Sequence, residues 1–239
     1  MNDSRIIVSL DFPEMKMAVN FAKKIDPERC RLKIGKQLFT NSGPLIVELL
    51  TDAGFEIFLD LKFHDIPNTV ASACQSAAKL GVWMINVHAI GGKLMLEAAR
   101  EAIDRESHQP MLMAVTLLTS ISKNDLSRIG IQLSIKEIVY LLTMDSLESG
   151  FDGVICSAQE SHVLRDRIDK DFCLVTPGIR PSGFDKHDQS RIVTPKDAIL
   201  AGSNYLVIGR PITQAKEPLK TLESIELEIN KAIAEVNNG

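Results

Sequence analysis

The chain has 239 residues, 45% of them hydrophobic and 24% charged, which is enough for one large core and usual for a single α/β barrel, so we expect one domain over residues 1–239. The net charge of −4 and the pI of about 5.8 exclude the overall basic field that attracts nucleic acids or anionic membranes. An anionic ligand must therefore be held by a local cluster of residues, which favours a small molecule.

Eight short segments rich in Val, Ile, Leu and Phe predict strands, and they are Ile6–Asp11, Arg31–Gly35, Glu56–Lys62, Trp83–His88, Met111–Thr119, Gly153–Ser157, Phe172–Pro177 and Tyr205–Gly209. Helical patterns follow them at Pro13–Lys24, Pro44–Ala53, Asn68–Leu80, Gly92–Ile103, Ser134–Ser149, Ser157–Ile168, Pro195–Ala201 and Glu217–Val236. Apolar strands that alternate with helices are typical of a parallel sheet covered by helices. Eight such units predict an α/β fold, a single-domain TIM (β/α)8 barrel.

A doubly wound open sheet is the alternative fold. It usually carries spaced glycines after its first strand, where the phosphates of a dinucleotide bind. Here Asp11-Phe12-Pro13 stands at that point, so the sequence favours the barrel.

The four cysteines, Cys30, Cys74, Cys156 and Cys173, are widely separated and include no Cys-x-x-Cys pair. This spacing predicts reduced, mostly buried thiols and not disulfides or a zinc site, so we expect a cytoplasmic protein. No apolar run approaches the roughly 18 residues of a membrane span. The N-terminus leads directly into the first predicted strand, so we expect no export signal.

Polar residues gather where the predicted strands end. The active sites of TIM barrels lie at the carboxyl ends of the strands, so these residues are the candidates for a site. They are Asp11, Lys33, Asp60, Lys62, His88, Thr119, Ser120, Gly178, Arg180, Gly209 and Arg210.

Asp60 and Lys62 are two residues apart on a predicted strand, so both side chains are expected on the face that lines the barrel mouth. A structural salt bridge is the alternative, but charges inside an apolar strand are costly to bury without a use. With Lys33 and Asp65, the pair predicts an alternating array of two cations and two anions. A lysine flanked by carboxylates keeps its charge, so Lys62 is the candidate proton donor.

The loops after the seventh and eighth predicted strands, residues 176–181 and 208–211, combine glycine with Arg180 and Arg210. These loops are the usual phosphate site of TIM barrels, so we expect phosphate binding there. The polar segment Ser182–Arg191 has the composition of a lid, with Gln189 as the candidate ligand contact, although an ordinary solvated loop is the alternative. No His, Asp and Glu spacing predicts a metal site.

Several motifs together resemble bacterial orotidine 5′-phosphate decarboxylases. The most specific is Phe58–Thr69, which contains Asp60-Leu61-Lys62-Phe63-His64-Asp65. The others are Leu10-Asp11, Lys33-Ile34-Gly35, Asn86-Val87-His88-Ala89, Leu118-Thr119-Ser120, Val175–Pro181 and Val207–Pro211. The resemblance spans nearly the whole chain in the right order, and its one departure is Ile90, where a smaller residue is common.

This resemblance implies decarboxylation of orotidine 5′-monophosphate to uridine 5′-monophosphate, the last step of pyrimidine nucleotide synthesis, without metal or other cofactor. It implies that Lys62 protonates carbon 6 of the ring, Asp60 faces the substrate carboxylate, and Lys33 holds Asp60 and a ribose hydroxyl. The other substrate-binding residues that it implies are Asp11 at the ribose, Thr119 and Ser120 at the pyrimidine, and Pro177, Arg180, Gln189, Gly209 and Arg210 around the phosphate. It also implies that Ile66 binds substrate, and it implies a homodimer in which Asp65 and Thr69 complete the site of the neighbouring subunit.

Three other functions are weighed against this one. Magnesium-dependent sugar-phosphate lyases share Asp-x-Lys-x-x-Asp, but they carry a glutamate metal ligand where this chain has Lys33. A Schiff-base aldolase needs a lysine that loses its proton readily, which neighbouring carboxylates disfavour. A non-catalytic nucleotide-binding barrel predicts a damaged charged array, and all four residues of the array are present.

Overall fold

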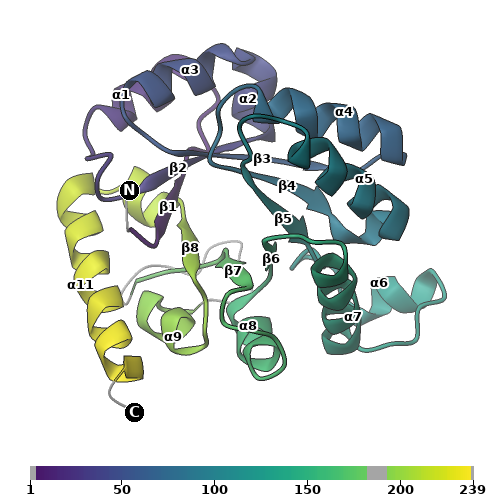
Figure 1. Ribbon diagram of the computed structural model, residues 1–239. Helices are drawn as coiled ribbons and strands as arrows, with labels where there is room; N and C mark the ends of the chain where they lie inside the picture. The colour runs from purple at the N-terminus through teal and green to yellow at the C-terminus, as the bar shows by residue number, and fades with distance from the viewer. Residues whose placement is uncertain (1–3, 182–192, 238–239) are drawn as a thin grey trace.

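The computed structural model describes residues 4–181 and 193–237, so the predicted lid and Gln189 lie outside the described residues. Eight parallel strands close into a barrel in chain order, and β1 pairs with both β2 and β8 (Figure 1). The strands are β1 Ile6–Ser9, β2 Arg31–Gly35, β3 Ile57–Phe63, β4 Met84–His88, β5 Met111–Val115, β6 Gly153–Ile155, β7 Cys173–Thr176 and β8 Tyr205–Ile208. The predicted TIM barrel is confirmed.

Helices surround the strands (Figure 1). They are α1 Met15–Ala22, α2 Lys36–Ser42, α3 Leu45–Asp52, α4 Pro67–Ala78, α5 Lys93–Asp104, α6 Lys123–Arg128, α7 Ile135–Glu148, α8 Ala158–Arg165, α9 Pro195–Leu200, α10 Arg210–Thr213 and α11 Pro218–Asn237, with a 3-10 turn η1 at Ala89–Gly91. All eight predicted helices are present with shifted ends. The sequence prediction omits α2, α6, α10 and η1, because segments this short have too few turns to show an amphipathic period.

Alternation along the strands produces two hydrophobic cores. Leu32 and Ile34 of β2 face outward and pack in the large core beneath the helices. The barrel interior holds a smaller core made of Ile7, Phe58, Met84, Met113, Cys173, Val175 and Val207. Side chains therefore fill the barrel, as in other folds of this type. The space left for a ligand is at its ends.

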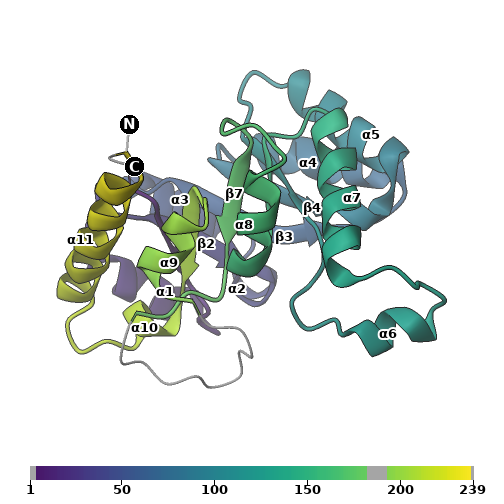
Figure 2. The same cartoon turned by 90° about the horizontal axis from the view of Figure 1, so that it is seen from below.

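Several strands end earlier than predicted. β5 ends at Val115, so Thr119 and Ser120 lie in the connection that follows it. That connection carries α6, which projects away from the barrel in Figure 2. Capping boxes at Ser122 and Ser134 begin α6 and α7, because each serine accepts a hydrogen bond from the third residue of its helix.

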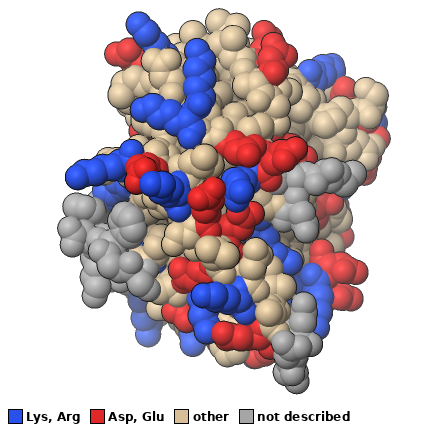
Figure 3. Space-filling model, turned by 90° about the vertical axis from the view of Figure 1, so that its left-hand side faces the viewer, with Lys and Arg blue, Asp and Glu red and all other residues tan. Residues whose placement is uncertain are grey.

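The cysteines agree with the expectation of buried thiols. All four cysteines are free and buried, and burial raises the pKa of each thiol to about 12. Within residues 4–181 and 193–237, no helix has the length and apolar character that a membrane crossing requires. On the face shown in Figure 3, basic and acidic side chains are interspersed and no patch of one sign dominates.

Candidate active site

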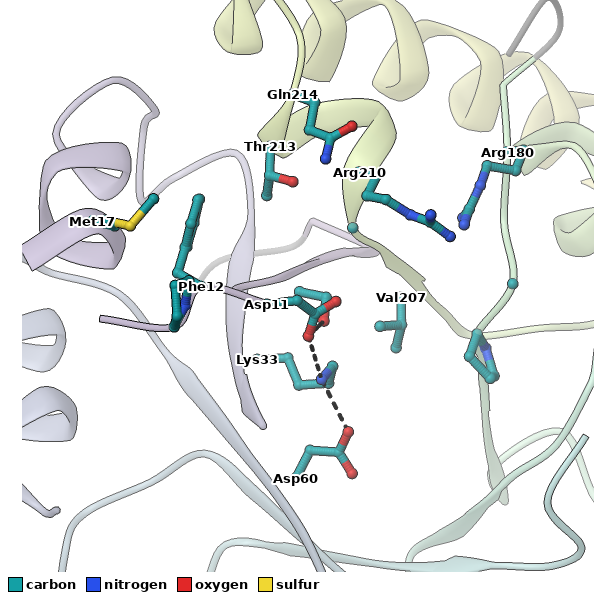
Figure 4. A pocket seen from close by; sticks show the side chains of 15 residues that line it. Asp11, Phe12, Met17, Lys33, Asp60, Arg180, Val207, Arg210, Thr213 and Gln214 are labelled. Carbon is teal, nitrogen blue, oxygen red and sulfur yellow. Dashed lines mark hydrogen bonds and ion pairs between the residues drawn. The ribbon is translucent and has the colours of Figure 1, made fainter. Parts of the chain in front are cut away.

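A chain of four alternating charges lies at the carboxyl ends of the first three strands. Lys33 Nζ is 3.0 Å from Asp60 Oδ2 and 3.7 Å from Asp11 Oδ1, and Lys62 Nζ is 2.5 Å from Asp60 Oδ1. Figure 4 shows Lys33 between the two carboxylates. The predicted array therefore exists, but its second anion within the chain is Asp11. Asp65, the second anion that the sequence predicts, makes no ion pair within the described residues, so its place in the array stays a prediction.

Asp60 is almost fully buried, with 7% of its surface exposed. Burial alone raises the pKa of its carboxyl group. The positive charges of Lys33 and Lys62 and hydrogen bonds from Lys62 and Asn86 outweigh that effect, and they lower the pKa to about 2. Asp60 is therefore a carboxylate at neutral pH, and it faces an ammonium group on each side.

The backbone at Lys62 departs from a regular strand. Its φ angle is +52°, and Lys62 is the one non-glycine residue with positive φ in the described part of the chain. The register between β3 and β4 shifts between Leu59 and Phe63, where this irregularity lies. The contact between Asp60 and Lys62 is confirmed, and it lies on an irregular part of the strand.

Two adjoining cavities meet at the charged array. The larger has a volume of about 810 Å³ and is lined by Ser9, Asp11, Phe12, Pro13, Met17, Lys33, Asp60, Pro177, Gly178, Arg180, Val207, Gly209, Arg210, Thr213 and Gln214. In Figure 4 Arg180 and Arg210 lie on one side of this cavity, and Phe12 and Met17 lie on the other. The predicted residues of the two glycine–arginine loops thus converge on one space.

The smaller cavity has a volume of about 170 Å³ and is mostly apolar. It is lined by Lys33, Phe58, Asp60, Lys62, Val115, Leu117, Leu118, Thr119, Ile155, Cys156, Ser157, Pro177 and Val207. Lys33, Asp60 and Pro177 line both cavities. A ligand that spans the two would have an apolar part beside Lys62 and a polar part beside the arginines.

Gly209 is required by close packing at the edge of the larger cavity. A Cβ atom there would lie 3.3 Å from Asp11 Oδ2, which is tighter than an ordinary contact. Asp11 is itself held by a hydrogen bond of 2.8 Å from Ser9 Oγ. A side chain at position 209 would therefore crowd the outer anion of the array.

Five of the described candidate residues line neither of these two cavities, and they are Asp65, Ile66, Thr69, Ser120 and His88, which ends β4. Asp65, Ile66 and Thr69 are exposed, and Ile66 has 67% of its surface accessible. Asp65 Oδ1 accepts a hydrogen bond of 2.7 Å from Ile66 N, and Asp65 makes no ion pair within the described residues. Ser120 is also exposed, beside Thr119.

The sequence analysis assigned no role to two residues that contact the array. Ser9 bonds to Asp11, and Asn86 on β4 donates a hydrogen bond of 2.7 Å to Asp60 Oδ1. Asn86 is a polar residue inside an apolar strand, and this pattern could have identified it as a candidate from the sequence. Among the described residues, no group of three or more His, Cys, Asp or Glu side chains is arranged to hold a metal ion.

The fold and the site together define a TIM-barrel enzyme with a buried charged centre at the carboxyl ends of its strands. The model of the orotidine 5′-phosphate decarboxylase / HUMPS family matches residues 4–225, and the chain belongs to this family. The orotidine 5′-phosphate decarboxylase of Hydrogenovibrio crunogenus is 56% identical over 229 residues, which cover 96% of this chain and 97% of that protein. The enzyme of the same name from Hahella chejuensis is 56% identical, over 94% of this chain and 97% of that protein.

Solved structures agree with this assignment. The orotidine 5′-phosphate decarboxylase of Lactobacillus acidophilus superposes with a TM-score of 0.85 at 40% identity, covering 95% of this chain and all of that one (100%). The enzyme of Pyrococcus horikoshii OT3 gives a TM-score of 0.75 at 26% identity, with 94% and 99% of the two chains covered. Each of these proteins is similar along almost its full length.

Proposed function

We propose that Lys33, Asp60 and Lys62 form the catalytic centre with which this chain decarboxylates orotidine 5′-monophosphate. The activity itself is that of the family, and the product is uridine 5′-monophosphate, in pyrimidine nucleotide synthesis. The observation that supports the proposed centre is the position of the charged array, because it lies where the apolar cavity adjoins the cavity lined by arginines. A nucleoside monophosphate matches this pair of cavities, because it has a flat base at one end and an anionic phosphate at the other.

The proposed binding mode follows the lining of the two cavities. The pyrimidine ring occupies the smaller cavity beside Thr119 and Lys62, with Ser120 at its edge. The ribose lies against Asp11 and Lys33, which face the larger cavity. The phosphate-binding residues are Arg180, Gly209 and Arg210, with Pro177 between the two cavities and Gln189 contributed from outside the described residues.

The proposed chemistry requires a cation at carbon 6. Decarboxylation breaks the bond between carbon 6 and the carboxyl carbon, and the electron pair stays in the ring plane, where the π system does not delocalise it. Lys62 stabilises this charge with its ammonium group and then donates a proton to carbon 6. Asp60 holds Lys62 Nζ at 2.5 Å, so the positive charge is in place before the reaction begins. A solvent proton then restores Lys62.

No metal or organic cofactor is needed in this proposal. Both oxygens of Asp60 already contact ammonium groups, Oδ2 with Lys33 and Oδ1 with Lys62. A magnesium ion beside Asp60 would be repelled by both cations, which argues against the magnesium-dependent lyases. The array is also complete, which argues against a barrel that has lost its activity.

Turnover of the substrate tests the function. We expect the purified chain to decarboxylate orotidine 5′-monophosphate, followed by the change in ultraviolet absorbance, at the same rate with and without a chelator. No turnover at high enzyme concentration would contradict the function. Turnover that a chelator abolishes, and that added magnesium restores, would contradict the proposed absence of a metal.

We also propose that the chain, as one domain over residues 1–239, forms a cytoplasmic homodimer in which Asp65, Ile66 and Thr69 complete the site of the neighbouring subunit. Three features support this arrangement: the exposure of all three residues, the large accessible surface of apolar Ile66, and the lack of an ion pair of Asp65 among the described residues. Catalysis then depends on a carboxylate that the other subunit supplies.

A mixing experiment tests the shared site. The variants Asp65→Asn and Lys62→Ala are each expected to be inactive, but a hybrid dimer holds one site with both native residues. Random exchange makes half of the dimers hybrids, so the mixture should regain about one quarter of the wild-type activity. A mixture that exchanges subunits but stays inactive would show that Asp65 acts within its own chain.

A further inference from the structure

Asn86 lies fully buried on β4 and uses both polar atoms of its side chain on the proposed catalytic pair. Its Oδ1 accepts a hydrogen bond of 2.8 Å from the backbone N–H of Lys62, and its Nδ2 donates one of 2.7 Å to Asp60 Oδ1. One amide therefore connects the backbone of Lys62 to the carboxylate that holds the Lys62 ammonium.

These two contacts fall on the distorted part of β3. The positive φ of Lys62 leaves its N–H outside the regular ladder, because the register with β4 shifts between Leu59 and Phe63. A buried N–H without a partner is costly, and Asn86 Oδ1 supplies the partner. The same amide fixes Asp60 Oδ1, which also lies 2.5 Å from Lys62 Nζ.

The chemistry of the amide suits this position. Its acceptor faces a donor, the N–H of Lys62, and its donor faces an acceptor, the carboxylate of Asp60. Among uncharged side chains, only Asn and Gln offer a good acceptor and an NH₂ donor on one rigid plane. A leucine of similar size would leave the N–H of Lys62 without this acceptor and would remove one of the two donors to Asp60 Oδ1. An aspartate would set a second negative charge against Asp60.

We propose that Asn86 is a positioning residue for decarboxylation, which holds the strained backbone of Lys62 and the carboxylate of Asp60 so that the Lys62 ammonium stays aimed at the reacting carbon. This inference rests on the proposed function of Lys62 and Asp60. The alternative is a purely structural role, in which Asn86 only satisfies the irregular strand. The two roles differ in kinetics, because a structural residue alters the folded fraction and leaves the turnover of each folded molecule unchanged.

Two variants and a control separate these roles. Asn86→Leu removes both hydrogen bonds, and a displacement of about 1 Å at Lys62 should lower kcat by roughly 10²-fold. KM should change by less than about threefold, because Asn86 lines neither of the two cavities in which the substrate is proposed to bind. Thr143→Val is the matched control, since Thr143 is fully buried on α7 and loses one hydrogen bond to Val139. Its kcat should equal that of the wild type when activity is corrected for the folded fraction.

Asn86→Ala provides a second variant, in case the leucine side chain does not fit beside Asp60. It removes both hydrogen bonds without adding bulk or charge, so kcat per folded molecule should again fall by roughly 10²-fold, with KM within about threefold of wild type. A purely structural role predicts an unchanged kcat for each folded molecule.

The outcomes are distinct. A loss of kcat in both Asn86→Leu and Asn86→Ala, with little change in KM, supports the positioning role. If the leucine variant does not fold, the kcat of Asn86→Ala decides alone. An active wild type, with Asn86 variants that keep kcat per folded molecule within about threefold, overturns this inference and leaves the proposed function intact. An inactive wild type overturns the proposed function first.

Discussion

The two ends of the barrel carry ion pairs of nearly the same length, one from β2 to the residue before β3 and one from β2 to β3 itself. At the amino end Arg31 Nη2 lies 2.9 Å from Glu56 Oε2, and at the carboxyl end Lys33 Nζ lies 3.0 Å from Asp60 Oδ2. Arg31 and Lys33 are two residues apart on the inner face of β2, and Phe58 of the inner core lies between the two pairs. Sequence spacing alone therefore does not distinguish them.

The surroundings of the two ion pairs distinguish them. The Arg31 guanidinium lies 4.2 Å from the Trp83 ring and 5.1 Å from the Tyr205 ring, so aromatic faces enclose it. Neither of the two cavities at the active site reaches Arg31. Lys33 borders both cavities and continues into a chain of further charges. A pair whose cation packs against aromatic rings stabilises the fold, whereas a pair that borders a cavity is available for chemistry.

The largest expected effect is at the carboxyl end. Lys62→Ala removes both the stabilising cation and the proton donor, so kcat should fall by at least about 10⁴-fold. Binding of uridine 5′-monophosphate, measured by calorimetry, should remain within a few-fold of wild type, since the arginine loops are unchanged. Near-normal turnover in this variant would reject the assigned role of Lys62.

Arg210→Ala tests the arginine-lined cavity. For the phosphorylated substrate kcat/KM should fall by roughly 10²–10³-fold, because a charge-assisted contact that supports the chemical step is lost. For a truncated substrate without the phosphate group, the wild type and the variant should turn over at equal rates. An equal loss with both substrates would place Arg210 at the ring and not at the phosphate.

The amino end should affect stability alone. Arg31→Met leaves Glu56 unpaired and removes the stacking on Trp83, so we expect a loss of about 2 kcal/mol and a melting temperature lower by roughly 4–8 °C. The kcat of the folded enzyme should not change. The matched variant Lys33→Met, two residues along the strand, should instead lose most activity. If Arg31→Met also lowers kcat per folded molecule, the contrast between the two ends is wrong.

The smallest effect is a pH dependence of stability at His88. Burial, followed by the positive charges of His64, Lys36 and Lys62, lowers the pKa of His88 from 6.5 to about 4. Below pH 6.5 the unfolded chain binds a proton that the folded chain does not bind, so stability decreases as the pH falls from about 6.5 to 4.

Urea unfolding at pH 7 and pH 5 measures this contribution. Because the ring is only half-buried, we expect His88 to account for about 1 kcal/mol of the difference, which His88→Asn should remove. The exposed residue His162 supplies the control variant His162→Asn. An unchanged pH dependence in His88→Asn would refute the assignment.

The sequence predicts the barrel well, because alternating apolar strands and amphipathic helices are local patterns. It misses short helices such as α2 and α10, which have too few turns to show a period. It does not identify the difference between Arg31 and Lys33, since that difference arises from Trp83 and Tyr205, which are distant in sequence. Long-range packing decides which buried charge is structural.

The same distinction between local patterns and long-range packing applies to the prediction of the site. Asp60, Lys62 and Lys33 stand out as charges in apolar strands, and their contacts are confirmed. The sequence did not predict that Asp11 also contacts Lys33, which follows from the pairing of β1 with β2. The predicted place of Asp65 in the array stays a prediction. The alternation of side chains along a strand does not predict the positive φ of Lys62, whose N–H donates to Asn86 on β4.

A crystal structure of the chain with an unreactive analogue of uridine 5′-monophosphate tests the central claim most directly. We predict the pyrimidine in the apolar cavity with carbon 6 within about 3.5 Å of Lys62 Nζ, and the phosphate between Arg180 and Arg210. A base that lies in the larger cavity, away from Lys62, would contradict the proposed catalytic centre.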